Sequence, residues 1–103
     1  MEKAKLFYEC IMCGTPFDIE IDAGNFKCAS KDADGRGECL YEYKSNTYCC
    51  GNEIEIRIHV WSSQGGGLIR HEITDKGLVN LRTENFENIL NEVCRQMGSL
   101  MFA

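Results

Sequence analysis

Cysteine spacing constrains this chain more than any other feature. Seven cysteines stand in 103 residues, and the first two form the motif Cys10-Ile11-Met12-Cys13-Gly14. Two thiolates separated by two residues can turn toward one tetrahedral ion, and a following glycine permits the positive φ that such a turn often needs. We interpret this motif as a knuckle, a tight turn whose two cysteines bind the same ion. Non-ligating core thiols and a redox dithiol are the alternatives.

The amino-terminal sequence bears on whether the cysteines form disulfides. MEKAKLFYECIMCG lacks the apolar run of a signal peptide, and no segment has the apolar length of a membrane span. We therefore expect a cytoplasmic protein with no membrane partner, in a compartment where stable disulfides are rare. An odd number of cysteines also fits a fully paired framework poorly. Metal binding is the favoured interpretation.

A second part of the site is expected near residues 47–61, TYCCGNEIEIRIHVW. Cys50 precedes a glycine and a strand, as Cys13 does, but a complete second knuckle would need a cysteine at Thr47. Adjacent residues in a strand point to opposite faces, so Cys49 and Cys50 would both bind only if the turn is irregular. The expected ligands are Cys10, Cys13, Cys39 and Cys50, with Cys28, Cys49 and His71 as alternates.

On the motifs CIMCG and YCCGNEIEI, residues 8–60 resemble the zinc ribbon superfamily. The resemblance implies one structural zinc ion with four protein ligands and no open catalytic position. It also implies a module that binds nucleic acid or another protein. Such an ion would suit a small domain, because metal binding can supply folding free energy that a thin core lacks.

Apolar periodicity predicts several strands and one helix. Phe17, Ile19 and Ile21 alternate with carboxylates, and the residues Ile54, Ile56, Ile58 and Val60 alternate with polar ones. Residues 44–46 are predicted to form a hairpin turn. Residues 62–67, SSQGGG, are predicted to form another, which would pair Trp61 with Leu68 and Ile58 with His71. Apolar spacing of three and four residues predicts a helix after Thr83, with Thr83 as its N-cap.

These elements predict one α+β domain over residues 1–103. It would be a small β-rich, zinc-ribbon-like domain with antiparallel hairpins and one C-terminal α-helix. Residues 1–53 would form the cysteine-rich, metal-binding part, and residues 54–103 the long hairpin and the helix.

No arrangement of residues is typical of a catalytic centre, so we expect no enzyme activity. The function predicted is that of a small zinc-stabilised regulatory module that binds a protein partner. The face of the long hairpin turned away from the core would be the binding surface, with residues Arg57, His59, Trp61, Leu68 and Arg70.

Three alternatives remain open. The same cations and Trp61 could stack on nucleic acid, although the net charge of −5 weighs against that. The acidic stripe Asp18, Glu20 and Asp22, with the acidic turn at 30–38, could make the protein an inhibitor of a nucleic-acid enzyme. Cys10 and Cys13 could instead act as a dithiol redox pair.

Overall fold

The computed structural model describes residues 2–30, 38–63 and 65–102, and it confirms an α+β fold. The elements are β1 (Ala4–Cys10), β2 (Pro16–Ile21), η1 (Ala23–Asn25), β3 (Lys27–Ser30), β4 (Cys39–Cys49), β5 (Asn52–Ser62), β6 (Leu68–Lys76), β7 (Leu78–Glu84) and α1 (Phe86–Phe102). Most of the acidic turn predicted at 30–38 lies outside the described residues, Asp32 and Asp34 included.

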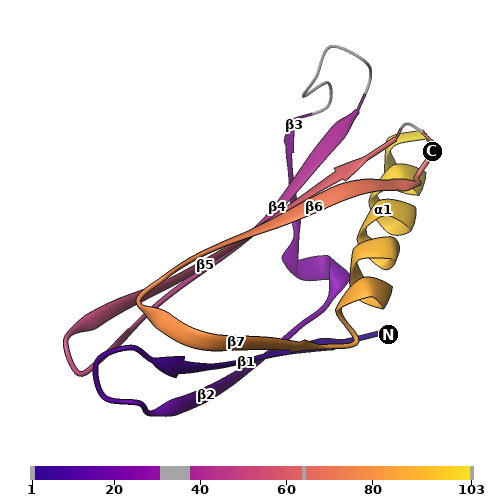
Figure 1. Ribbon diagram of the computed structural model, residues 1–103. Coiled ribbons are helices and arrows are strands. Elements are labelled where there is room, and N and C mark those ends of the chain that lie inside the picture. Colours follow the sequence, from indigo (N-terminus) through magenta and orange to yellow (C-terminus); the bar gives the residue numbers. More distant parts are fainter. Residues whose placement is uncertain (1, 31–37, 64, 103) are drawn as a thin grey trace.

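Two antiparallel sheets form the body of the domain. One has the strand order β2-β1-β7 and the other β3-β4-β5-β6. The sheets meet at the end that carries the β1–β2 and β4–β5 turns, and they diverge toward α1, which lies between them at the far end (Figure 1). The domain is elongated, with extents of 46 × 28 × 18 Å.

The core lies between the inner faces of the sheets. Strand alternation places apolar side chains inward: Ala4, Leu6, Tyr8 and Cys10 on β1, and Ile54, Ile56, Ile58 and Val60 on β5. The predicted helical stripe is buried as well, at Phe86, Ile89, Leu90, Val93 and Cys94. The periodicity thus identified correctly which residues face the core. The helix begins at Phe86, and Thr83 belongs to β7 instead of capping the helix.

The predicted turn at 44–46 is wrong. Strand β4 runs without interruption from Cys39 to Cys49, and the chain reverses at 49–52 instead. Cys50 and Gly51 occupy the two central positions with φ of 49° and 81°. Two successive positive φ values characterise a type I′ turn, whose twist matches that of the flanking strands.

The predicted pairing of β5 with β6 has the right strands and the wrong register. Trp61 lies opposite Arg70 and Ile58 opposite Ile73, two residues from the predicted pairing. A bulge after Trp61 brings Ser62 opposite Leu68. Because Ser62 lies on the core face, Leu68 packs against the core and is not on the outer face, where the sequence analysis placed it.

Candidate metal centre

The two hairpin turns bring four cysteine sulfurs together. Sγ atoms of Cys10, Cys13, Cys49 and Cys50 all lie within 4.8 Å of one another. Two contacts join the hairpins, with Cys10 Sγ 3.8 Å from Cys50 Sγ and Cys13 Sγ 3.6 Å from Cys49 Sγ. We call these residues the four-cysteine group; four sulfurs at such distances could hold a metal ion.

Backbone hydrogen bonds form the first turn. Cys10 ends β1, its N–H donates to the Thr15 carbonyl at 3.0 Å, and its own carbonyl accepts from the Gly14 N–H at 2.8 Å. Gly14 has a φ of 76°, in the left-handed region that glycine tolerates best. The loop returns the chain into β2 and directs the Cys10 and Cys13 sulfurs to the same side.

The type I′ turn explains how two adjacent cysteines can both contribute. Cys49 is the last residue of β4 and pairs with Asn52. Cys50 is the first central residue of the turn, with a φ of 49°, so the alternation of a flat strand no longer applies to it. Cys49 and Cys50 were expected to bind one ion together only if the turn is irregular. The type I′ turn is such an irregularity.

A third turn, between β6 and β7, is hydrogen-bonded to both cysteine turns. The Gly77 carbonyl accepts a hydrogen bond from the Ile11 N–H at 3.1 Å and another from Asn52 Nδ2 at 2.9 Å. Asn52 Nδ2 also donates to Cys10 Sγ at 3.6 Å. These contacts join one turn of the three-stranded sheet, one turn of the four-stranded sheet and the connection between the sheets.

The four thiols differ in their affinity for protons. Hydrogen bonds, chiefly from the Thr15 hydroxyl 3.0 Å away, lower the pKa of Cys13 to about 6. The pKa of Cys10 is lowered, first by the Cys13 backbone N–H. Partial removal from water and the neighbouring thiols raise the pKa of Cys49, and the same causes raise that of Cys50 to about 12. Neighbouring thiolates repel one another, so the four thiols do not all lose their protons readily. A bound cation would offset this repulsion.

Cys39 is not in the four-cysteine group, so its expected role as a ligand is wrong. It is buried opposite Ser62 at the other end of β4 from Cys49, roughly 30 Å away at the rise of a strand. The other alternates also lie elsewhere. Cys28 is exposed on β3 opposite Tyr41, and His71 is exposed on β6 with its ring edge against Phe86.

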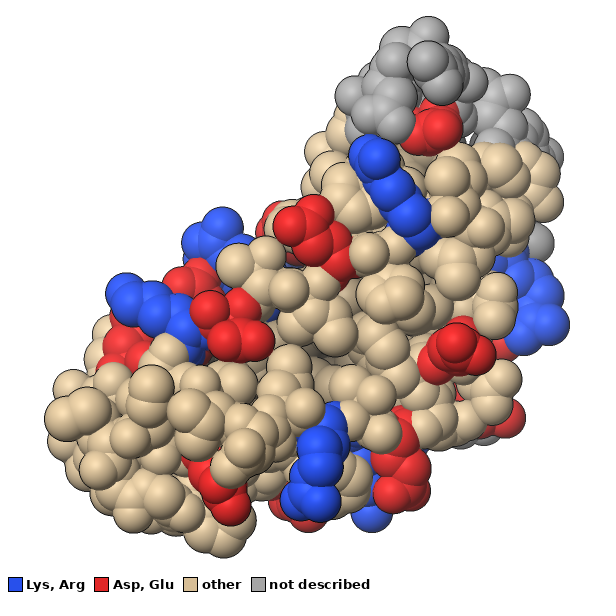
Figure 2. All heavy atoms as spheres, in the orientation of Figure 1, with Lys and Arg blue, Asp and Glu red and all other residues tan. Residues whose placement is uncertain are grey.

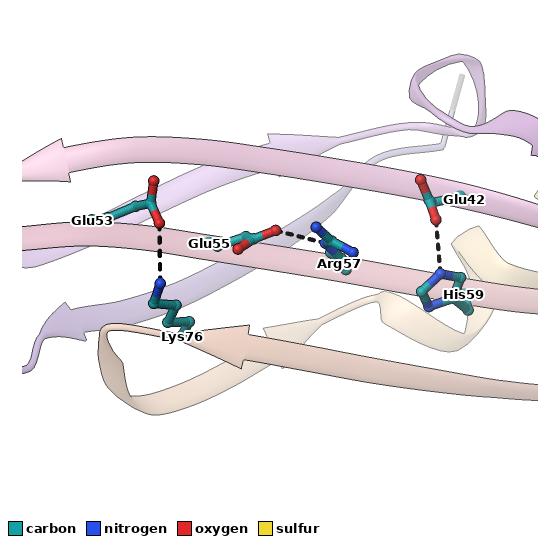
Figure 3. A network of polar contacts seen from close by, with 6 residues as sticks. All are labelled: Glu42, Glu53, Glu55, Arg57, His59 and Lys76. Atoms are coloured by element: carbon teal, nitrogen blue, oxygen red, sulfur yellow. Dashed lines mark hydrogen bonds and ion pairs between the residues drawn. The ribbon is translucent and has the colours of Figure 1, made fainter.

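The outer face of the β4-β5-β6 sheet carries most of the predicted partner-binding residues. Two ion pairs and one hydrogen bond bridge its side chains: Arg57 pairs with Glu55 at 2.6 Å, Lys76 pairs with Glu53 at 3.3 Å, and His59 Nε2 is hydrogen-bonded to Glu42 at 2.8 Å (Figure 3). The Arg70 guanidinium carbon lies 4.3 Å from the centroid of the Trp61 ring, in a cation–π contact. Four of the five predicted residues share this face, and Leu68 does not.

Sequence reasoning missed Asn52 and Gly77, which position the cysteine turns. Gly77 contacts a turn that is far away in the sequence, and such a contact has no local signal. Among the described residues, no helix has the length and apolar character needed to cross a membrane. Comparisons with protein-family models, with curated proteins and with solved structures find no significant match to this chain.

Proposed function

We propose that this protein is a small cytoplasmic binding module stabilised by one zinc ion, bound to Cys10, Cys13, Cys49 and Cys50. The observation that carries the proposal is the convergence of four sulfurs within 4.8 Å from two separate hairpin turns. A tetrahedral zinc ion with Zn–S bonds of about 2.3 Å requires sulfurs about 3.8 Å apart. The two contacts between the hairpins, at 3.6 and 3.8 Å, agree with that requirement.

The donor set favours a structural ion. Four thiolates suit zinc or iron, and occupation of all four tetrahedral positions by the protein leaves none for a substrate. The zinc ribbon resemblance supports the same assignment, because each of two hairpins contributes two cysteines. In this chain the second pair is adjacent, at Cys49 and Cys50, and the type I′ turn substitutes for the usual spacing.

The proposed role is to bind a protein partner and regulate it, without catalysis. For the nucleic-acid alternative, the outer face offers Arg57, but that cation is bonded to Glu55 on the same face. Phosphate binding would have to compete with such pairs and with the net charge of −5. These observations favour a protein partner over nucleic acid.

The test is native mass spectrometry of freshly purified protein, with zinc measured per chain. We expect one zinc ion in the wild type and none after Cys49→Ser. Cys28→Ser is the matched control, because Cys28 is an exposed cysteine outside the four-cysteine group, and it should keep the ion. A metal-free wild type, or a Cys49→Ser variant that still binds one zinc, would refute the assignment.

The same samples separate the zinc site from a dithiol redox pair. A redox pair predicts reversible loss of two hydrogen masses under mild oxidation and a fold that does not depend on a chelator. A structural ion predicts that the four thiols resist alkylation until the chelator is added, and that the chelator unfolds the domain.

A further inference from the structure

Exposed apolar side chains gather around the four-cysteine group. Ile11 is 55 % exposed, Met12 72 %, Tyr48 68 % and Val79 37 %. Ile11 and Met12 lie between the first two cysteines, Tyr48 directly precedes Cys49, and Val79 follows Leu78, the strand partner of Cys10. Among the large hydrophobic side chains described as exposed, only Ile69 lies elsewhere.

The two turns also lack charge. Residues 10–17, CIMCGTPF, and residues 45–52, SNTYCCGN, contain no Asp, Glu, Lys or Arg, although these make up 26 % of the chain. Figure 2 shows the corresponding end of the molecule as a nearly continuous uncharged surface. We call the exposed part of these two segments, together with Val79, the apical surface. Charge depletion combined with Met and aromatic side chains is typical of the buried centre of a protein interface.

The apical surface is both protruding and rigid. It occupies one end of the longest dimension of the domain, 46 Å, where the two sheets meet (Figure 1). Hydrogen bonds from Ile11 and Asn52 to the Gly77 carbonyl hold its turns together. A preorganised surface loses little conformational entropy when it binds, so a few apolar side chains can contribute useful affinity.

The charges directly behind the apical surface are mainly acidic. Glu9 precedes the first uncharged segment and Asp18 follows it, whereas Lys44 precedes the second segment and Glu53 follows it, so three of the four flanking charges are acidic. Lys76, near the same end, is bonded to Glu53 at 3.3 Å. An acidic border disfavours approach to anionic lipid headgroups and favours a border of opposite charge.

We propose that the apical surface docks into an apolar groove of a protein partner, and that Lys or Arg side chains border this groove. Ile11 and Met12 enter the groove, and Tyr48 lies at its edge with its hydroxyl bonded to Glu53. The inference rests on the proposed function only in that the zinc ion fixes the turns. The side chains assigned to the groove, Ile11, Met12 and Tyr48, are not themselves metal ligands.

The experiment uses p-benzoylphenylalanine at position 12 of the full chain for photo-crosslinking in a lysate of the source cells. The matched control carries the same probe at Lys27, an exposed position on β3. A protein captured at position 12 and not at position 27 is then purified, and its affinity is measured by titration calorimetry. Zinc per chain is measured for every variant, so failure of the metal site is distinguishable from failure of docking.

We expect saturable binding and a crosslink to an apolar groove bordered by Lys or Arg. Met12→Asp should weaken the affinity roughly ten- to a hundredfold, the range expected for one buried apolar side chain, and Lys27→Asp should leave it unchanged. Three results would overturn the proposal: no crosslink specific to position 12, an acidic or polar partner site, or an affinity insensitive to Met12→Asp.

Two further measurements exclude other occupants of the apical surface. Phosphatidylcholine vesicles that bind the wild type and not Met12→Asp would reassign the surface to a membrane. A concentration-dependent dimer in analytical ultracentrifugation that Met12→Asp abolishes would reassign it to a second copy of this chain. Either result replaces the proposed partner, and the proposal predicts neither.

Discussion

Replacement of Gly77 by alanine should destabilise the domain more than the same change at Gly14 or Gly51, the positive-φ glycines of the two cysteine turns. Gly77 has a φ of 79°, and a Cβ placed there would lie 2.1 Å from the Glu53 carbonyl oxygen and 3.2 Å from Asn52 Nδ2. The first distance is far below van der Waals contact, and the clashing atom belongs to the backbone. Relief of the clash must therefore move the β6–β7 turn away from β5.

Gly14 and Gly51 provide matched controls. Their φ values are 76° and 81°, and a Cβ at either position would meet no atom within 4 Å. All three substitutions carry the left-handed strain of about 1 to 2 kcal/mol, partly offset by the lower entropy of the unfolded alanine chain. At Gly14 and Gly51 the net loss should be about 1 kcal/mol. Gly77→Ala adds overpacking and weakens two hydrogen bonds to the Gly77 carbonyl, for a total of about 4 kcal/mol.

Urea unfolding at a fixed free zinc concentration measures these losses. With a urea slope of about 1.5 kcal/mol per molar, the midpoint should fall by more than 2 M for Gly77→Ala and by less than 1 M for each control. Gly77→Ala should also weaken zinc binding, because the Gly77 carbonyl anchors both cysteine turns. Equal midpoints for the three variants would refute the inference that the β6–β7 turn is locked against β5.

Three other changes test separate parts of the structure. Asn52→Ala removes hydrogen bonds to the Gly77 carbonyl and to Cys10 Sγ, so we expect a loss of about 2 kcal/mol in urea unfolding and weaker zinc retention against a chelator. Burial raises the pKa of Tyr41, so the folded state keeps a proton that the unfolded chain releases above about pH 10. The unfolding free energy should therefore fall as the pH rises past that value, and Tyr41→Phe should show a smaller fall. Arg70→Ala removes the cation–π contact with Trp61 and should cost only about 0.5 to 1 kcal/mol, measured in the same urea assay.

Strand faces and the helix were predictable because they depend on local alternation. The inward residues of β5 and the buried stripe of α1 follow directly from apolar spacing. Register was less predictable, because it depends on the bulge after Trp61, a feature with no sequence signature in SSQGGG. That single irregularity moved Leu68 from the predicted outer face to the core.

The candidate site was predictable only where it depends on local sequence signals. The spacing of Cys10 and Cys13 is a local signal, and the Cys-Gly repeat pointed to Cys50. Choosing Cys39 over Cys49 followed from the assumption that the chain turns at 44–46 and that residue 50 stays in a strand. A type I′ turn usually contains Asn-Gly or Asp-Gly, and here Cys50 holds the first position with positive φ. Because Cys50 replaces the usual Asn or Asp, the sequence at 49–52 does not look like a type I′ turn.

The positions of the four cysteines in the chain explain why a bound ion would matter to the whole domain. Cys10 and Cys50 are 40 positions apart, and Cys13 and Cys49 are 36 apart. A link that closes a loop of this size restricts the unfolded chain by about 4 kcal/mol at 25 °C, whereas a link within one knuckle closes only a short loop and restricts it far less. Total stabilities of domains this small are about 5 to 15 kcal/mol. Since the linked turns belong to different sheets, loss of the ion should destabilise the contact between the sheets and not merely loosen one loop.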